Sequence, residues 1–455
     1  MSCDLVALRQ RLEAIVGSSY LDVDPDSRAA FAVDGLLPAL LVRPGTQDEV
    51  AAVVSACAAE DGALVPWGGG TAMGTGNRPE RVDVVVRLDR LDRVVAFDPD
   101  NLCVTVEAGM PLARLQELIA TKKLLLPLDP PAATRVTLGG LVAANLSGPR
   151  RLLHGTPRDW VLGLRVVLPD GERIHCGGRV IKNVSGYDMN KLFIRSFGTL
   201  GIITEVTVKL LPSPAAQASV LGLFPDLQAA AAVVEQVLAS FLLPEALDLL
   251  DPGALELLVP TLGSGATGGF AVVAGFSGSQ AAVDREIRDM ETLVAAQGGT
   301  TRRFLEGDST SLWAAITNAF QGLPQDPLRV LCTMAVPIGR TVGMLASART
   351  RAIGQDLVTT LSAHAGSGIL RAAFSPAAGA SGDRSLPALA ATLEALREET
   401  LAAGGSLVIQ EASPRLKERV DAWGRPGSGF ATMRRIKAEF DPQRLCSPGR
   451  FLGGI

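Results

Sequence analysis

The sequence predicts an α+β protein of two domains. Its 455 residues exceed the roughly 250 to 300 residues that one hydrophobic core organises, so more than one core is expected. Hairpins and half-buried strands dominate residues 46–214, whereas strand, helix, strand units recur after residue 220. We therefore expect one domain over 1–214, a second over 215–425, and a proline- and glycine-rich closing segment over 426–455.

Two amphipathic helices are expected near the start of the chain. Leu5, Leu8, Leu12 and Ile15 share one side of the first, and Asp4 stands where an export signal would need a basic start. The second is expected over 46–61, because Thr46-Gln-Asp-Glu49 has the spacing of a capping box.

A glycine-rich loop follows, with the sequence VPWGGGTAMGTG at 65–76, between strands expected at 63–67 and 82–88. A Walker loop would end in Gly-Lys-Ser/Thr, and a Rossmann turn would lead directly into a helix, so both are excluded. Two interpretations remain open. The loop is either a concavity of backbone N–H groups that binds an anion, or an ordinary glycine-rich turn.

A second loop with the same potential is expected at 126–150. It follows a hairpin over 94–109 and a helix over 111–123, and its first prolines extend the chain. Thr137 can begin a short helix through Asn145, whose small residues would let the backbone approach a flat ligand. The start of that helix is expected to offer unpaired N–H groups to phosphate.

The remaining pattern separates the two domains. A hairpin over 161–168 and 173–176 and a half-buried strand over 201–210 complete the first domain. Four strand, helix, strand units then begin near residues 218, 268, 328 and 367, with helices expected over 226–241, 278–297, 339–353 and 385–403. These units predict an antiparallel sheet covered by helices on one face.

Composition excludes several classes of function. The formal net charge is −4, so nothing in the charge balance would attract nucleic acid or an anionic membrane. The most apolar window, 227–243, is interrupted by Glu235 and Gln236, so no transmembrane segment is expected. The 6 cysteines stand singly, without the spacing of zinc or iron-sulfur ligands, and are interpreted as reduced thiols in a cytoplasmic protein.

At this point the motifs resemble a known group. The glycine loop, PLDPPAATRVTLGGLVAANLSGP at 127–149, HGTPRDWVLGLRVVLPDGE at 154–172, RVIKNVSGYDMNKLFIRSFGTLGIITEVTVKLLP at 179–212 and FDPQRLCSPGRF at 440–451 occur in the order typical of the vanillyl-alcohol oxidase and p-cresol methylhydroxylase group. Within it, the chain is most similar to FAD-binding subunits of bacterial glycolate oxidases and related 2-hydroxy acid dehydrogenases. The resemblance implies a PCMH-type flavin domain of two subdomains, a cap domain over 215–425, and a tail that returns to the flavin domain.

The resemblance also implies the cofactor and the residues that hold it. FAD is expected to lie against the glycine loop, and non-covalently, because no histidine occurs between residues 60 and 80. Valine at Gly69 or Gly70 is expected to occupy the place of the phosphate. The cofactor-binding residues implied are Pro66, Gly68, Gly69, Gly70, Thr71, Met73, Gly74, Pro130, Thr137, Gly139, Gly140, Ala143, Asn145, Ser147, Gly148, Gly155, Ile202, Ile203 and Arg450.

The chain departs from the family at the metal site. Relatives that oxidise 2-hydroxy acids carry His-x-Gly-Asp-Gly-Asn-Leu-His and a later Glu-His-Gly, whereas this chain has HAGSGILR at 364–371 and then QEASP. His364 matches the first histidine, Arg371 replaces the second, and Glu411 is followed by Ala412. One imidazole and one carboxylate do not make a closed ligand set, so no metal is expected. His364 as base and Arg371 as carboxylate partner are one catalytic interpretation; a structural or relay role is the other.

The function predicted is that of the FAD-binding subunit of a multi-subunit 2-hydroxy acid dehydrogenase. Its expected partners are a catalytic flavoprotein homologue and an iron-sulfur subunit, and the complex would take a small 2-hydroxy acid such as glycolate. Membrane contact, if any, would be peripheral and through those partners. A self-contained FAD dehydrogenase and a non-redox scaffold subunit are the alternatives.

Overall fold

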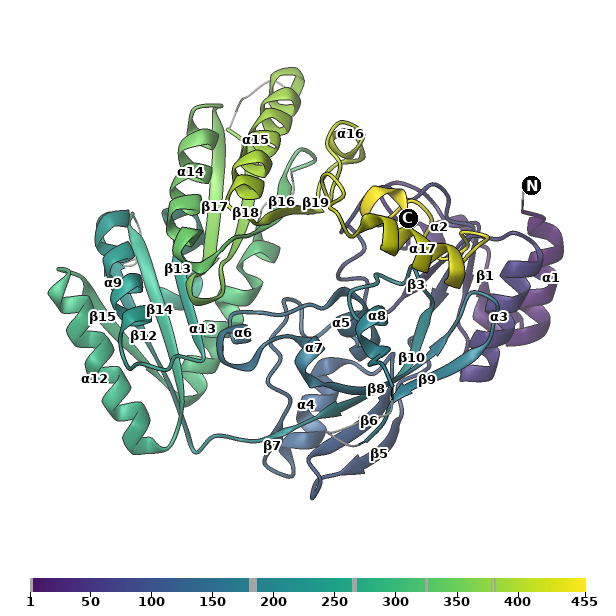
Figure 1. The fold of residues 1–455 in the computed structure, drawn as a ribbon, viewed down its shortest axis with the longest axis horizontal. Coiled ribbons are helices and arrows are strands. Elements are labelled where there is room, and N and C mark those ends of the chain that lie inside the picture. The colour runs from purple at the N-terminus through teal and green to yellow at the C-terminus, as the bar shows by residue number, and fades with distance from the viewer. Residues whose placement is uncertain (1–2, 180–185, 264–267, 324–325, 378, 380–381) are drawn as a thin grey trace. The chain divides into compact units, whose positions relative to one another are not determined.

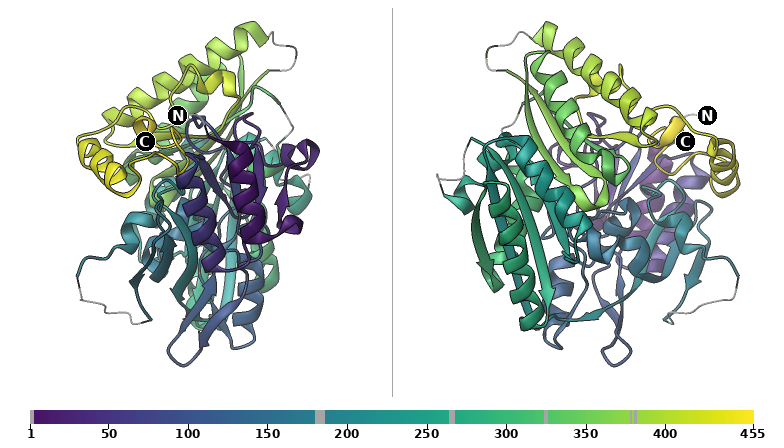
Figure 2. Two further views of the ribbon diagram at one scale, coloured as in Figure 1. Left: turned by 90° about the vertical axis from the view of Figure 1, so that its right-hand side faces the viewer. Right: turned by 60° about the vertical axis from the view of Figure 1, so that its left-hand side comes forward.

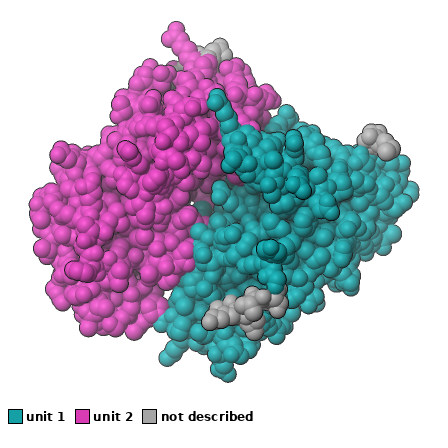
Figure 3. Space-filling model, viewed as in Figure 1, with its two compact units in different colours: residues 1–146, 156–213, 425–455 teal, residues 147–155, 214–424 magenta. Residues whose placement is uncertain are grey.

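The computed structural model describes residues 3–179, 186–263, 268–323, 326–377, 379 and 382–455 (Figure 1). The chain forms two compact units, coloured separately in Figure 3. Unit 1 contains residues 1–146, 156–213 and 425–455, and unit 2 contains 147–155 and 214–424. The carboxyl-terminal segment thus belongs to the same unit as the glycine-rich loop.

The first sheet of unit 1 has the strand order β1-β2-β4-β3, in which β2, β4 and β3 run parallel. Residues of α1 and α3 pack with it in one core, and the Oγ1 of Thr46 accepts the N–H of Glu49 at 3.1 Å, as the capping pattern predicts. The glycine-rich loop joins β3 to its parallel neighbour β4, so its position between two strands is confirmed. The elements are α1 (Leu5–Val16), β1 (Leu21–Asp22), α2 (Pro25–Ala29), β2 (Leu40–Val42), α3 (Gln47–Ala59), β3 (Leu64–Trp67) and β4 (Val84–Arg87).

The second sheet of unit 1 is antiparallel throughout, with the order β5-β6-β10-β8-β9. Both predicted hairpins lie in it, and the predicted strand at 201–210 is its centre. The elements are β5 (Val94–Asp98), β6 (Cys103–Glu107), α4 (Leu112–Ala120), β7 (Leu124–Leu125), α5 (Leu138–Ala144), α7 (Pro157–Trp160), β8 (Val161–Val167), β9 (Arg173–Gly177), α8 (Asn190–Phe193), β10 (Ile202–Lys209), β11 (Leu211–Pro212) and α17 (Phe430–Phe440).

Unit 2 is built on an eight-stranded antiparallel sheet with the order β15-β12-β14-β13-β17-β18-β16-β19. Its helices α9, α12, α14 and α15 cover one face, as Figure 2 shows, and α10, α11 and α13 cover the other. The elements are α6 (Arg151–His154), β12 (Ala216–Phe224), α9 (Leu227–Ala239), β13 (Ala246–Leu250), α10 (Pro252–Leu257), α11 (Val259–Leu262), β14 (Phe270–Gly278), α12 (Gln280–Ala296), β15 (Thr300–Leu305), α13 (Glu306–Asn318), β16 (Val330–Ala335), α14 (Thr341–Ile353), β17 (Leu357–His364), β18 (Ile369–Pro376), α15 (Gly382–Ala402), β19 (Ser406–Glu411) and α16 (Pro414–Lys417).

The four strand, helix, strand units predicted from the sequence are present. They are β12-α9-β13, β14-α12-β15, β16-α14-β17 and β18-α15-β19. Two units interleave in each half of the sheet, and the halves meet where β13 pairs with β17 over Asp248–Leu250 and Ser362–His364. The periodic pattern did not indicate α10, α11 and α13, which cover the second face. Because helices cover both faces, the central strands are buried on both sides and do not alternate between buried and exposed residues.

Candidate functional site

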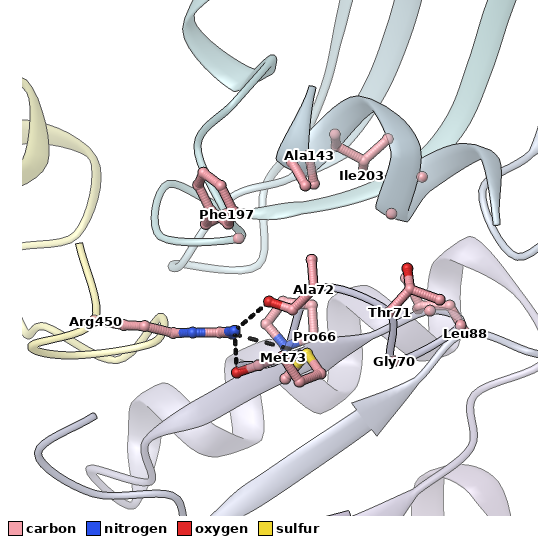
Figure 4. A pocket seen from close by; sticks show the side chains of 17 residues that line it. Pro66, Gly70, Thr71, Ala72, Met73, Leu88, Ala143, Phe197, Ile203 and Arg450 are labelled. Atoms are coloured by element: carbon pink, nitrogen blue, oxygen red, sulfur yellow. Dashed lines mark hydrogen bonds between the residues drawn. The ribbon is translucent and has the colours of Figure 1, made fainter. Parts of the chain in front are cut away.

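A pocket in unit 1 lies between two walls of backbone and small side chains (Figure 4). One wall is the glycine-rich loop after β3, and the other combines α5 with the residues around the start of β10. The side chain of Arg450 reaches the glycine-rich loop from the carboxyl-terminal tail. The lining residues are Pro66, Gly68, Gly69, Gly70, Thr71, Ala72, Met73, Leu88, Gly139, Gly140, Ala143, Ala144, Phe197, Gly198, Gly201, Ile203 and Arg450.

The glycine-rich loop presents successive N–H groups without protein partners. Within the described part of the chain, no protein acceptor takes the N–H groups of Gly69 to Met73. Gly70 has a φ of 70°, which glycine adopts readily, and Thr71 to Gly74 form a turn. These residues are only partly exposed to water, so their N–H groups need another hydrogen-bond acceptor, which a ligand rich in oxygen atoms would supply. A concavity of this kind suits a diphosphate.

The glycines are required by the contact between the two loops. A β-carbon on Gly69 would lie 1.7 Å from the carbonyl oxygen of Arg135, and one on Gly68 would lie 2.3 Å from the Oγ1 of Thr137. A β-carbon on Gly70 would meet the ring of Trp67 at 2.8 Å. The expectation that valine at Gly69 or Gly70 would occupy the place of a phosphate is therefore wrong. A side chain at Gly69 would meet the backbone of residues 135 and 136, and one at Gly70 would meet the ring of Trp67.

The start of α5 has no free amides to offer. The N–H of Leu138 donates to Met110 O at 2.9 Å, that of Gly139 to Ala108 O at 2.7 Å, and that of Gly140 to the Oγ1 of Thr137 at 3.3 Å. The expectation of unpaired N–H groups at this helix start is wrong, because the turn between β6 and α4 supplies the acceptors. The small residues of α5 still line the pocket and leave room for a flat ligand.

Arg450 brings a buried cation to the glycine loop. Its side chain is 3% exposed, and its Nη2 donates to the carbonyl oxygens of Ala72 at 2.9 Å and Met73 at 2.7 Å (Figure 4). Burial lowers the pKa of the guanidinium to about 10, against the opposing effect of the Asp34 charge. The group remains charged at neutral pH, so the pocket carries a positive charge beside its free amides.

The structure gathers many of the residues predicted to hold the cofactor. Eleven of them line the pocket: Pro66, Gly68, Gly69, Gly70, Thr71, Met73, Gly139, Gly140, Ala143, Ile203 and Arg450. Ile202 lies on the opposite side of β10, in the core with Val167, because successive strand residues point to opposite faces. Those outside the lining are Gly74, Pro130, Thr137, Asn145 and Ile202 in unit 1, and Ser147, Gly148 and Gly155 in unit 2.

Several lining residues were missed by sequence reasoning. They are Ala72, Leu88, Phe197, Gly198 and Gly201. Phe197 and Gly198 have φ values of 52° and 70°, and a positive φ at a phenylalanine is uncommon. The Ser-Phe-Gly-Thr-Leu-Gly run around them was a signal of a special loop conformation, but it did not indicate which side chains would face the pocket.

The second group of predicted residues lies buried in unit 2. His364 Nδ1 lies 2.8 Å from the carboxylate of Asp248, which also accepts the hydroxyl of Ser362 at 3.2 Å. Both side chains are buried, so this hydrogen bond fixes the orientation of the imidazole ring. Asp248 and His364 are direct partners across β13 and β17, where the two halves of the sheet meet.

Arg371 lies on the same face of the sheet, on β18. Its Nη1 donates to Thr317 O at 2.9 Å, and its guanidinium lies 4.4 Å from the ring centre of Phe320. Burial lowers the pKa of Arg371 to about 10, while the charge of Asp248 opposes this. Both predicted catalytic side chains are thus in one polar cluster inside unit 2.

The metal-binding residue types do not assemble in the described chain. Over the ranges described above, no group of three or more His, Cys, Asp or Glu side chains is placed to hold a metal ion. Glu411 instead lies 3.5 Å from the guanidinium of Arg329. The six cysteines are all unbonded. No helix among the described residues is long and apolar enough to cross a membrane.

Two known protein families match this chain, one in each half. The family described as FAD binding domain matches residues 38–177, and FAD linked oxidases, C-terminal domain, matches residues 213–451. Glycolate oxidase subunit GlcD of Bacillus subtilis (strain 168) is 26% identical over 457 residues, which cover 97% of this chain and 96% of the relative. The mitochondrial D-lactate dehydrogenase [cytochrome] of Arabidopsis thaliana is 25% identical and covers 98% and 78% of the two chains.

A solved structure gives the same fold. The crystal structure of p-cresol methylhydroxylase with substrate bound superposes with a TM-score of 0.77 at 16% identity, covering 97% of this chain and 96% of that one. The PCMH-type α+β fold predicted from the sequence is confirmed.

Proposed function

The chain belongs to the FAD-linked oxidases, and on that premise we propose that it is the FAD-binding subunit of a multi-subunit 2-hydroxy acid dehydrogenase of the glycolate-oxidising type. It is an FAD-dependent oxidoreductase, and its relatives include glycolate oxidase and D-lactate dehydrogenase. The subunit role rests on the likeness to a named subunit and on the polar cluster in unit 2.

The observation that carries the cofactor assignment is the row of free amides from Gly69 to Met73. They would hold the diphosphate of FAD, with Arg450 adding positive charge nearby. The glycines and alanines of α5 and the side chain of Ile203 would border the flat parts of the cofactor. When bound, FAD supplies the two-electron acceptor for an alcohol carbon, and the chain holds and shields it.

The polar cluster in unit 2 favours a partner subunit as the site of oxidation. Nδ1 of His364 forms a hydrogen bond with Asp248. The guanidinium of Arg371 donates to Thr317 O and lies over the ring of Phe320. Both side chains are nearly fully buried, so in this arrangement neither presents a free charged group to a substrate carboxylate. This supports the structural or relay interpretation of His364 and Arg371.

A self-contained dehydrogenase is the second candidate, and the hydrogen bond between His364 and Asp248 is the one observation that favours it. An imidazole whose Nδ1–H is held by a carboxylate keeps Nε2 as a base, which is how a histidine removes a hydroxyl proton. In that case Arg371 would exchange its bond to Thr317 for one to the substrate carboxylate.

The partners proposed are a catalytic flavoprotein homologue and an iron-sulfur protein. All six cysteines of this chain are unbonded and scattered along it, so an iron-sulfur cluster would belong to another subunit. The complex would work in the cytoplasm and meet a membrane through those partners.

Anaerobic reduction of the bound flavin distinguishes these functions. We expect the purified chain to be yellow and to keep its colour with glycolate or D-lactate, whereas the complex isolated with its natural partners is bleached. Bleaching of the chain alone would establish the self-contained dehydrogenase. A colourless chain that takes up no added FAD would establish the scaffold.

A further inference from the structure

Two buried cations of the carboxyl-terminal tail contact the pocket walls in unit 1. Lys437 on α17 is 4% exposed, and Arg450, beyond the end of that helix, is 3% exposed. Each side chain donates to backbone carbonyl oxygens of a different wall. Cations are rarely buried without a specific use, because taking a charge out of water is costly.

Lys437 holds the wall formed by residues 197–201. Its Nζ donates to Thr199 O at 2.7 Å, to the carboxylate of Asp441 at 2.6 Å, and to Cys446 O at 3.1 Å. An ammonium has three N–H groups, so all of its donors are used. The pocket residues Phe197 and Gly198 directly precede the carbonyl that Lys437 holds.

Arg450 holds the glycine loop through its carbonyl side. The oxygens of Ala72 and Met73 both accept from Nη2, and the described chain contains no cis peptide bond. In a trans peptide the N–H points opposite to the C=O, so the N–H groups of Met73 and Gly74 point away from Arg450. A cation beside the carbonyl oxygens of a turn and an anion beside its N–H groups both interact favourably with the peptide dipoles.

We propose that Arg450 and Lys437 are positioning residues for FAD: Arg450 holds the glycine loop with the free amides of Gly69 to Met73 directed at the diphosphate, and Lys437 holds the opposite wall at residues 197–201. The tail then acts as a clamp on both walls of the pocket. If the tail contacts favour FAD binding, bound FAD must favour the tail contacts by the same free energy.

The test compares Arg450→Met and Lys437→Met with Arg435→Met, an exposed arginine on the same helix as Lys437. The FAD dissociation constant of each flavin-free protein is measured by flavin fluorescence. Loss of two charge-assisted hydrogen bonds predicts a rise of about tenfold or more for Arg450→Met and no change for Arg435→Met. Arg450→Lys retains a cation and is expected to recover part of the affinity.

The melting temperature separates positioning from general stabilisation. A positioning role predicts that the rise in melting temperature on adding FAD shrinks in Arg450→Met and Lys437→Met, whatever happens to the flavin-free proteins. Lower melting temperatures with an unchanged FAD dissociation constant would overturn the proposal.

A measurement on the wild-type protein covers the case in which the variants do not fold. FAD is expected to slow amide hydrogen exchange across residues 430–450 as well as in the glycine loop. Protection that stays confined to the loop would count against the clamp.

Discussion

Gly69 and Arg135 approach so closely that a β-carbon on the glycine would lie 1.7 Å from the arginine carbonyl oxygen. The glycine loop and the second loop are therefore in backbone contact beneath the pocket. The absence of a side chain at Gly69 serves this contact, and the free amides of the loop remain for the ligand. The geometry of the diphosphate site depends on two segments that are far apart in the sequence.

The first prediction concerns that contact. Gly69→Ala should strip the protein of flavin and destabilise unit 1, because the new methyl group cannot share the space of the Arg135 carbonyl. Flavin content per protein and the melting temperature measure the effect. Gly178→Ala is the control, since its β-carbon would meet no atom within 4 Å and Gly178 lies in unit 1 but does not line the pocket. Equal flavin content in the two variants would contradict the loop contact.

The second prediction concerns the seam of the eight-stranded sheet. Asp248→Ala should lower the free energy of unfolding of unit 2 by about 1 to 3 kcal/mol, because it leaves the buried His364 and Ser362 without their hydrogen-bond partner. Urea unfolding followed by far-ultraviolet circular dichroism measures it, with the exposed Glu256→Ala as control. In a double-mutant cycle, Asp248→Ala and His364→Ala should be strongly non-additive. Additive effects would show that the two side chains are not coupled.

The third prediction concerns pH. Glu245 is buried, which raises its pKa, but the hydrogen bond from His154 and the charge of Arg150 outweigh burial and bring the pKa below 4.5. A lowered carboxyl pKa contributes stability that is present above about pH 4.5 and is lost as the pH falls through the folded pKa. Glu245→Gln should therefore be less stable than wild type at neutral pH, and the difference should shrink in acid. Thermal melts across this range measure it, and the exposed Glu235→Gln should show no such trend.

The fourth prediction concerns metals. His364 is held by Asp248, and Glu411 lies beside Arg329. We therefore expect that a chelator removes no metal from this chain and leaves the rate of flavin reduction by the 2-hydroxy acid in the isolated complex unchanged. The rate before and after chelation is the measurement, and the metal content of the isolated chain is the control. The prediction would be contradicted by a metal that is bound to this chain in stoichiometric amount and whose removal by the chelator abolishes flavin reduction.

Local sequence predicted the elements well wherever a pattern repeats along the chain. The capping spacing at Thr46 placed α3, the position of the glycine loop between two strands excluded the Walker and Rossmann arrangements, and the four strand, helix, strand units after residue 220 are all present. The helices α10, α11 and α13 were not predicted, because they cover a second apolar face of strands that are buried on both sides.

The sequence alone determined the fold class, the family and the loop that carries the free amides, since these depend on residue types at short spacing. Only the tertiary structure decided which amides stay free: those at the start of α5 are taken by the carbonyls of Ala108 and Met110, and those of the glycine loop are not. It also decided that Arg450 joins residues 72 and 73 and that Asp248 holds His364. The physical reason is that each backbone N–H bonds to the acceptor that tertiary packing places next to it. That acceptor can come from a segment far away along the chain.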